Sequence, residues 1–231
     1  MKIEISPKQI LIILLFIITV LLFANIMTVI SRIVFDHDHL YGLVGLFNFN
    51  TERNIPTLYS SAALIFSAIL LLFISYMNKI SHEPYILWGI LSLIFLFLSI
   101  DETSSIHEHL TTPTRDLLDT SSFLYYAWVI PYGLFLIGFI VVYFKFLLNL
   151  PRDIMVLFLI SGALFVLGAI GFEMLGGWLE ELHGSSGLVY AICYTCEEFL
   201  EMLGIIIFIY SLLTYILSQK KYLEIMLVGN K

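Results

Sequence analysis

Six long apolar runs follow one another along this chain, separated by short polar segments. They cover about residues 9–31, 56–77, 84–108, 122–148, 152–175 and 188–217. A helix needs about 20 apolar residues to cross the hydrocarbon core of a bilayer, and each run has about that length. Three runs begin at or just after a proline, Pro56, Pro84 or Pro151, which is typical of a first helical turn. Pro131 falls inside the fourth run, where we expect a kink.

This pattern predicts an all-α polytopic membrane protein with six transmembrane helices, folded as one bundle domain over residues 1–231. Composition agrees, because 60% of the 231 residues are hydrophobic and 13% are charged, whereas soluble domains carry roughly 25% charged residues. The first run is too long for the apolar region of a signal peptide. The expected partners are membrane lipids, with a homo-oligomer or a larger membrane complex left open and no nucleic acid.

Lysine and arginine are divided unevenly between the two ends of the predicted helices. One end, which in a six-span protein also holds both termini, has Lys2, Lys8, Lys79, Lys145, Arg152, Lys220, Lys221 and Lys231, and the other has Arg32, Arg53 and Arg115. Positive loops stay on the cytoplasmic side of a membrane. We therefore predict that both termini are cytoplasmic and that the chain lies in the inner (plasma) membrane. Most of the acidic residues and histidines then fall on the outer side.

Three segments carry acidic residues and histidines at or inside the outer ends of predicted helices. They read DETSSIHEHL, FEMLGGWLEELHG and CEEFLEMLG. If the third helix continues through the first segment, Asp101, Ser105 and Glu108 share one face. Glu197 and Glu201 lie one helical turn apart in the third segment.

Placing an ionised carboxylate inside the membrane costs free energy. One near the bilayer centre costs about 2.5–3.5 kcal/mol, and the cost falls toward zero at the interface. The acids could therefore be hydrated at headgroup level and inert. Two features argue against that: apolar sequence flanks Glu197 on both sides, and acids from three helices fall at similar depth. With only three arginines on that side, protons or metal ions remain as partners for these acids.

Carboxylate and imidazole ligands together suit iron, manganese or zinc. The Glu180-x-x-His183 spacing also matches a motif of metal sites in helical bundles. We therefore predict a divalent metal site between the third, fifth and sixth helices. The candidate ligands are Asp101, His107, Glu108, Glu173, His183, Glu197 and Glu201, and the candidate catalytic or proton-transfer groups are Glu102, Glu180 and Glu198. Such a site could serve a hydrolase or oxidoreductase that acts on a lipid or another apolar substrate.

Other functions remain open at this point. A proton or divalent-cation transporter or channel would need acids along a path to the inner side, where these helices are almost purely apolar. A non-catalytic subunit of a larger membrane complex is the third alternative. The FDHDHLYG loop could add ligands or could simply cap the first helix, and Cys193 and Cys196 could form a thiol pair or fill space.

The segments DETSSIHEHL, FEMLGG and EEFLEMLGIIIFIY resemble those of an uncharacterised family of small six-helix bacterial membrane proteins. The likeness covers roughly residues 43–217. It implies six helices and a shared acidic site, and it brings no assigned reaction. The C-x-x-C pair is not part of the family pattern.

Overall fold

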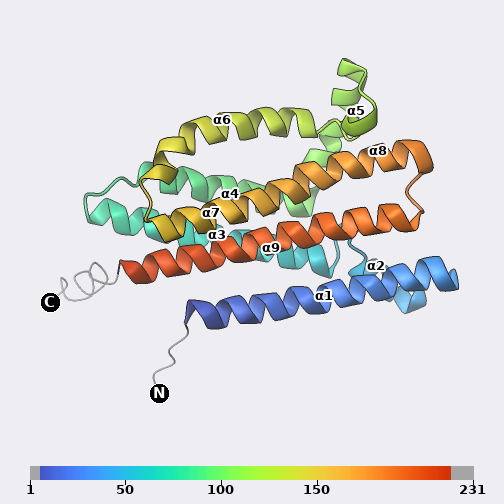
Figure 1. Ribbon diagram of the computed structural model, residues 1–231, viewed down its shortest axis with the longest axis horizontal. Coiled ribbons are helices and arrows are strands. Elements are labelled where there is room, and N and C mark those ends of the chain that lie inside the picture. Colours follow the sequence, from blue (N-terminus) through green and yellow to red (C-terminus); the bar gives the residue numbers. More distant parts are fainter. Residues whose placement is uncertain (1–5, 220–231) are drawn as a thin grey trace.

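The computed structural model describes residues 6–219, which form helices and connecting turns without a strand (Figure 1). Six helical units are long and apolar enough to cross a membrane: α1 (Pro7–Phe35), α3 (Ile55–Ile80), α4 (Ile86–Ser104), α6 (Val129–Leu148), the continuous unit Arg152–His183, and α9 (Leu188–Ser218). The predicted six-helix polytopic membrane protein is confirmed at this level. The cytoplasmic location of the termini stays a prediction.

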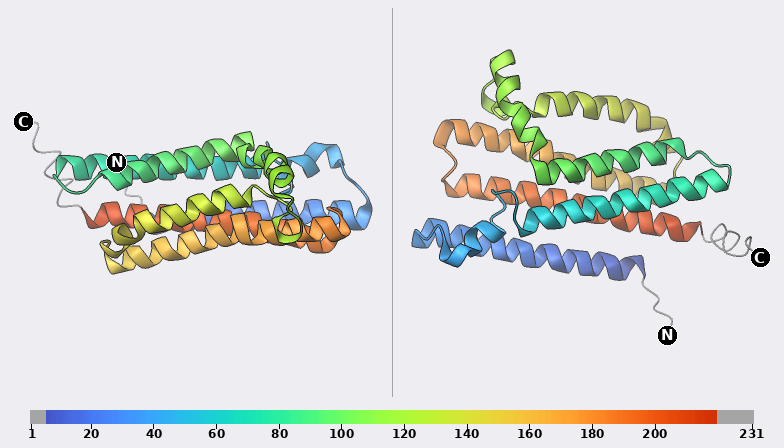
Figure 2. Two further views of the ribbon diagram at one scale, coloured as in Figure 1. Left: turned by 90° about the horizontal axis from the view of Figure 1, so that it is seen from above. Right: turned by 180° about the vertical axis from the view of Figure 1, so that it is seen from behind.

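The continuous unit consists of α7 (Arg152–Val166), a π-helical segment η3 (Leu167–Phe172) and α8 (Glu173–His183). The shorter elements are η1 (Leu40–Gly42), α2 (Leu43–Phe47), α5 (Ile106–Leu118) and η2 (Ser122–Leu124). The long helices run side by side, and α1 and α9 have their terminal ends at the same end of the bundle (Figures 1 and 2). The segment α5 projects from the opposite end.

Two sequence expectations about helix geometry are wrong. The third helix does not continue through its acidic segment, because Ser105 has a left-handed backbone (φ 54°) that ends α4 and redirects the chain into α5. Pro131 does not kink the fourth helix, since α6 begins only at Val129. A proline in the first turn removes an N–H that would have had no helical partner anyway.

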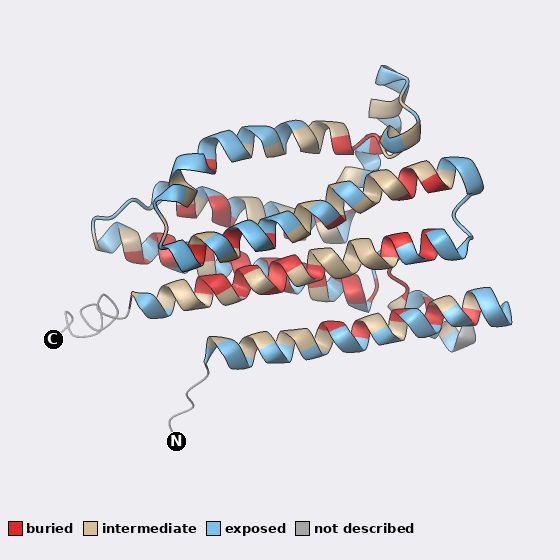
Figure 3. Ribbon diagram, viewed as in Figure 1, coloured by how far each residue is buried: buried red, intermediate tan, exposed pale blue. Residues whose placement is uncertain are grey.

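The helix α9 lies at the centre of the bundle and carries many of its buried residues (Figure 3). Asn25 of α1 is fully buried, donates to Thr195 Oγ1 at 2.8 Å and accepts from the Phe49 backbone N–H at 2.9 Å. Serines join α3 to α4, where the hydroxyls of Ser61 and Ser99 lie 2.8 Å apart. Small residues and polar bridges of this kind hold helices together in lipid.

Large apolar side chains cover the outside of the bundle. The helix α6 is the clearest case, with Leu134 exposed by 67% and Val141 by 72%, and Figure 3 shows it largely pale blue. Such a surface is suited to lipid contact and unsuited to water. Acidic side chains instead gather in an interior cavity, toward the end of the bundle opposite the start of α1 and the end of α9 (Figure 1).

Candidate metal centre

The turn after α4 brings His107 back onto Asp101. The Ser105 backbone N–H donates to the Asp101 carbonyl at 2.7 Å, and the His107 backbone N–H donates to Asp101 Oδ1 at 2.9 Å. The same Oδ1 lies 3.2 Å from His107 Nδ1, and Tyr132 Oη donates to Oδ2 at 2.9 Å. Asp101 is only 5% exposed. Both of its oxygens are thus engaged in holding neighbours, which makes it a support for His107 and not a free ligand.

The contact with Asp101 fixes which imidazole nitrogen of His107 is available. An ionised carboxylate can only accept, so Nδ1 carries the proton and Nε2 is left with a free lone pair. The Trp128 ring packs against the imidazole with 4.8 Å between ring centroids and restricts its rotation. Burial alone would lower the pKa of His107, but its hydrogen bond to Asp101 and the charge of that carboxylate outweigh burial and raise the pKa.

His107 forms a cluster with Glu52 and Glu108 whose candidate ligand atoms all lie within 4.8 Å of one another. Ligand atoms about 2.0–2.2 Å from one ion lie at most about 4.4 Å apart, so small side-chain movements would place all three on a single ion. Two carboxylate oxygens and one imidazole nitrogen suit zinc, manganese or iron. Burial, followed by the charge of Glu108, raises the pKa of Glu52, so a bound cation would relieve both effects.

The loop that carries Glu52 is held in place by Asn54, the residue that caps α3. Asn54 Oδ1 accepts from the Thr57 backbone N–H at 3.0 Å, and its amide donates to the carbonyls of Asn48 and Thr51 at 2.7 and 2.6 Å. This buried amide fixes the start of α3 and the turn before it at the same time. Glu52 is therefore presented from an ordered loop.

Five further glutamates line the same cavity, which has a volume of about 980 Å³. They come from α4, α8 and α9 and are Glu102, Glu173, Glu197, Glu198 and Glu201. Trp128 Nε1 donates to Glu173 Oε1 at 2.7 Å, and the carboxyl groups of Glu173 and Glu197 are hydrogen-bonded to each other. Within residues 6–219, no side chain or backbone group donates a hydrogen bond to the other three, Glu102, Glu198 and Glu201. These three carboxylates lie within electrostatic range of one another, because the charges of Glu198 and Glu102 both act on Glu201.

Close packing at two glycines sets the position of these acids. A Cβ at Gly168 in η3 would lie 2.7 Å from the Glu197 carbonyl oxygen, and a Cβ at Gly204 in α9 would lie 2.8 Å from the Ser161 carbonyl oxygen. No other residue type fits so near a neighbouring backbone. The π-helical segment ends directly before Glu173, and π-bulges are frequent at functional sites.

The structure separates the predicted site residues into groups. His107 and Glu108 belong to the three-residue cluster; Asp101 supports it; Glu102, Glu173, Glu197, Glu198 and Glu201 line the cavity. Glu180 also reaches the cavity but is engaged by the hydroxyls of Tyr126 and Tyr190. His183 is exposed at the end of α8 and is not among the residues that line the cavity. The Glu180-x-x-His183 spacing therefore does not form a pair of ligands.

Glu52 is the residue that sequence reasoning missed as a ligand. The only feature of the sequence that could have indicated it is its position on the predicted outer side, between the first two spans and beside Arg53. Nothing in NFNTERNIP resembles a ligand motif. Its contact with His107 depends on the long-range packing of the bundle.

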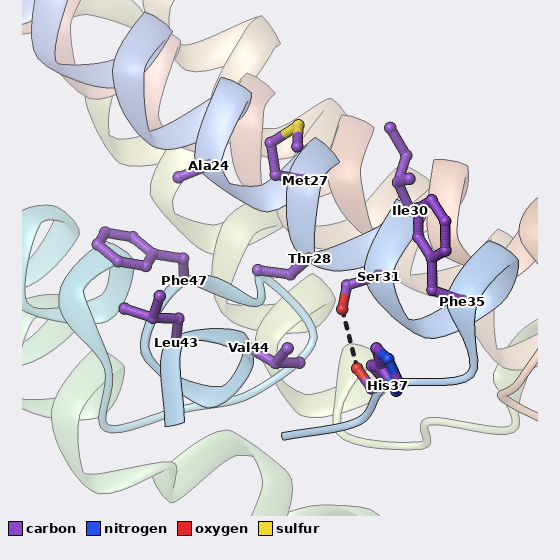
Figure 4. Close-up of a pocket in the computed structure, with 10 residues that line it drawn as sticks. All are labelled: Ala24, Met27, Thr28, Ile30, Ser31, Phe35, His37, Leu43, Val44 and Phe47. Atoms are coloured by element: carbon purple, nitrogen blue, oxygen red, sulfur yellow. Dashed lines mark hydrogen bonds between the residues drawn. The ribbon is translucent and has the colours of Figure 1, made fainter. Parts of the chain in front are cut away.

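The FDHDHLYG loop does not join this cavity and serves as a cap for α1. Asp36 adopts the left-handed conformation that ends the helix, Asp38 pairs with Arg32 at 3.5 Å, and Ser31 Oγ donates to the His37 carbonyl at 3.0 Å. His37 lines a separate pocket of about 360 Å³ between α1 and α2, whose other lining residues are mostly apolar (Figure 4). In α9, Cys193 and Cys196 are free thiols, and Cys193 donates to the Phe172 carbonyl at 3.4 Å.

Comparison with known proteins supplies a family and no activity. Residues 11–216 match a family described as a domain of unknown function, DUF8692. No curated protein and no solved structure matches the chain.

Proposed function

The chain belongs to this family of unknown function, and we propose from its own geometry that it is a membrane metalloenzyme that acts on a lipid or another apolar substrate. Glu52, His107 and Glu108 hold one divalent ion, which is iron, manganese or zinc. The observation that carries the proposal is the contact of His107 Nδ1 with buried Asp101, which leaves Nε2 as the nitrogen available to an ion in a cluster with two carboxylates. Histidines that bind metals characteristically donate their other N–H to a carboxylate in this way.

The surroundings of the cluster support a cation more than a set of inert headgroup-level acids. Eight glutamates line one cavity, namely the two of the cluster, Glu180, and the five others from α4, α8 and α9. One arginine, Arg115, lines the cavity with them, and its guanidinium is occupied by the Tyr125 carbonyl at 2.9 Å. Acids gathered in an interior of low dielectric repel one another unless a cation lies among them.

A bound divalent ion at such a site would polarise a substrate oxygen or lower the pKa of a bound water. The protein's own groups have separate tasks. Tyr132 and Asp101 hold the imidazole, while Glu102 and Glu198 have no hydrogen-bond donor from the described residues and are free to take up or deliver a proton. The apolar walls below the acids exclude water from the reacting groups.

The proposal includes an orientation. The metal cluster lies at the end of the bundle opposite the start of α1 and the end of α9 (Figure 1), and the distribution of lysine and arginine supports an outer location for it. A transporter would instead need polar groups along the whole length of the bundle. The part of the cavity that faces the other end is lined by residues such as Phe95, Phe139 and Phe158, which offer an ion no ligand.

Elemental analysis of the protein purified in detergent tests the proposal. We expect close to one equivalent of iron, manganese or zinc in the wild-type protein, and a loss of most of it in His107→Ala and Glu52→Gln. His183→Ala is the matched control, because this exposed histidine lies outside the cavity and its replacement should leave the metal content unchanged. Metal-free wild-type protein after incubation with each ion, or equal metal content in all variants, would contradict the proposal.

A further inference from the structure

The cavity that contains the acids extends far along the bundle. On α6 its lining runs from Tyr132, next to Asp101, to Leu147 near the other end of the helix. The 15 residue steps between them correspond to about 22 Å at 1.5 Å per step, which is most of the roughly 30 Å hydrocarbon core. Below the acids the lining is almost entirely aliphatic and aromatic. We refer to this lower part, lined by residues such as Phe95, Phe139 and Phe158, as the apolar limb.

The wall of the apolar limb between α6 and α7 contains side chains that other residues leave uncovered. Phe135 of α6 and Leu159 of α7 both line the cavity, and they are also exposed by 60% and 51%. A hydrocarbon chain that enters between α6 and α7, where these cavity-lining side chains are not covered by other residues, would not pass the acids. The limb therefore has the length, polarity and access that suit one long lipid chain.

The acidic end of the cavity favours a positively charged headgroup. Glu102, Glu198 and Glu201 accept no hydrogen bond from the described residues, and each lies within range of other acids. Arg115, the arginine that lines the cavity, stacks on Tyr125 and donates to its carbonyl. An anionic headgroup would meet these acids without a free cation to bind it. A primary ammonium group, by contrast, brings one positive charge and three N–H donors for three carboxylates without donors.

We propose that the cavity binds a long-chain lipid with a primary amine in its headgroup, with its hydrocarbon chain in the apolar limb and its ammonium group among Glu102, Glu198 and Glu201. This assignment rests on the proposed function only in naming the substrate class of the same cavity. The ammonium group would stand beside the Glu52–His107–Glu108 cluster, so the bonds next to the amine would be those presented to the metal.

Binding of three matched single-chain probes tests this inference: hexadecylamine, hexadecanol and hexadecyl phosphate. The full-length protein is placed in phosphatidylcholine nanodiscs near pH 7, where an amine is protonated, and occupancy is measured by native mass spectrometry over a concentration series. We expect hexadecylamine to bind tighter than hexadecanol by roughly tenfold or more, the scale of one charge-assisted hydrogen bond. Hexadecyl phosphate should bind weakest. Equal binding of all three, or tightest binding of the phosphate, overturns the proposal.

Variants locate the two parts of the lipid. Gly162 lines the apolar limb and Gly138 of α6 does not, and a Cβ would meet no atom within 4 Å at either position. Gly162→Phe should weaken binding of all the probes, whereas Gly138→Phe, the matched control, should not. Glu198→Gln should reduce the preference for the amine over the alcohol and leave hexadecanol binding unchanged. If Gly162→Phe binds like the wild type, the chain does not lie in the limb and the proposal fails.

The same measurements separate this inference from the proposed function. The protein can be assayed for metal and for hexadecylamine independently, and His107→Ala should lose metal while it still binds the amine. Amine binding by a wild-type protein that takes up no metal would contradict the metalloenzyme and support the lipid site. Stoichiometric metal without a preference for the amine would do the reverse.

Discussion

Replacement of Asp101 by asparagine isolates the contribution of one charge to the metal centre. The asparagine side chain has the same shape, and its amide oxygen can still accept from the His107 backbone N–H and Nδ1, while its NH₂ group can donate to Tyr132 Oη in place of the present bond. The geometry should therefore survive. The negative charge that makes the imidazole a stronger ligand is lost.

The expected magnitude follows from the role of such supporting carboxylates. Their removal typically weakens metal binding by 10–100-fold, which corresponds to about 1.4–2.7 kcal/mol at 1.36 kcal/mol per factor of ten. Asp101→Ala should cost more, because it leaves the His107 backbone N–H and the Tyr132 hydroxyl, both partly buried, without a partner at about 1–3 kcal/mol each. We therefore expect Asp101→Asn to fold with reduced metal affinity and Asp101→Ala to lose stability as well.

The assay is a competition between the detergent-solubilised protein and a chelator of known affinity, with zinc and manganese titrated separately. Asp116→Asn is the matched control, since Asp116 is an exposed acid on α5 and makes no hydrogen bond with the described residues. If Asp101→Asn binds metal as tightly as the wild type while Asp116→Asn also has no effect, His107 is not oriented for a metal, and the reasoning is refuted.

Three further predictions concern packing, pH and topology. Gly168→Ala should lower the stability of the folded protein by about 1–3 kcal/mol, the usual cost of overpacking, because its Cβ would lie 2.7 Å from a backbone oxygen of α9; Gly133→Ala, with open space around it, should not, and equal melting temperatures would contradict this. The pKa values of His107 and Glu52 are raised, so the metal-free folded protein binds protons more tightly than the unfolded chain. This protonation stabilises the folded state fully at a pH below the ordinary pKa values, and the stabilisation is lost as the pH rises through the raised pKa values. Melting temperatures should thus fall as the pH is raised from about 5 to 8, added zinc or manganese should reverse the fall, and a flat profile would count against it. A reporter fused after Lys231 should read out as cytoplasmic, and a periplasmic signal would invert the assignment of sides.

The sequence predicted the spans well because each is determined locally. A run of about 20 apolar residues in a chain with few charges can form little other than a membrane helix, since lipid leaves no partner for an unpaired backbone group. The sequence could not predict the break at Ser105, because a left-handed serine leaves no compositional mark and is favoured only once Asp101 accepts from His107.

The candidate site was predicted in part for the same reason. The acids of α9 share one side of a regular helix, so their convergence follows from spacing alone. Glu52 reaches His107 from the loop before α3, whereas His183 is exposed at the end of α8. Neither outcome follows from spacing. Contacts between distant segments depend on packing at residues such as Gly168 and Gly204, which sequence patterns do not resolve.

The π-helical segment directly before Glu173 determines the direction in which the Glu173 side chain points. An α-helix turns by about 100° per residue, and a π-helical turn takes up one extra residue, so a return of Leu167–Phe172 to α-helical bonding without loss of a residue would rotate Glu173 by about that angle relative to α7. The helix would still be long enough to cross the bilayer, but its carboxylate would leave Trp128 and Glu197. Membrane insertion of this unit therefore depends on its length and apolar composition, whereas site assembly also depends on the π-helical turn.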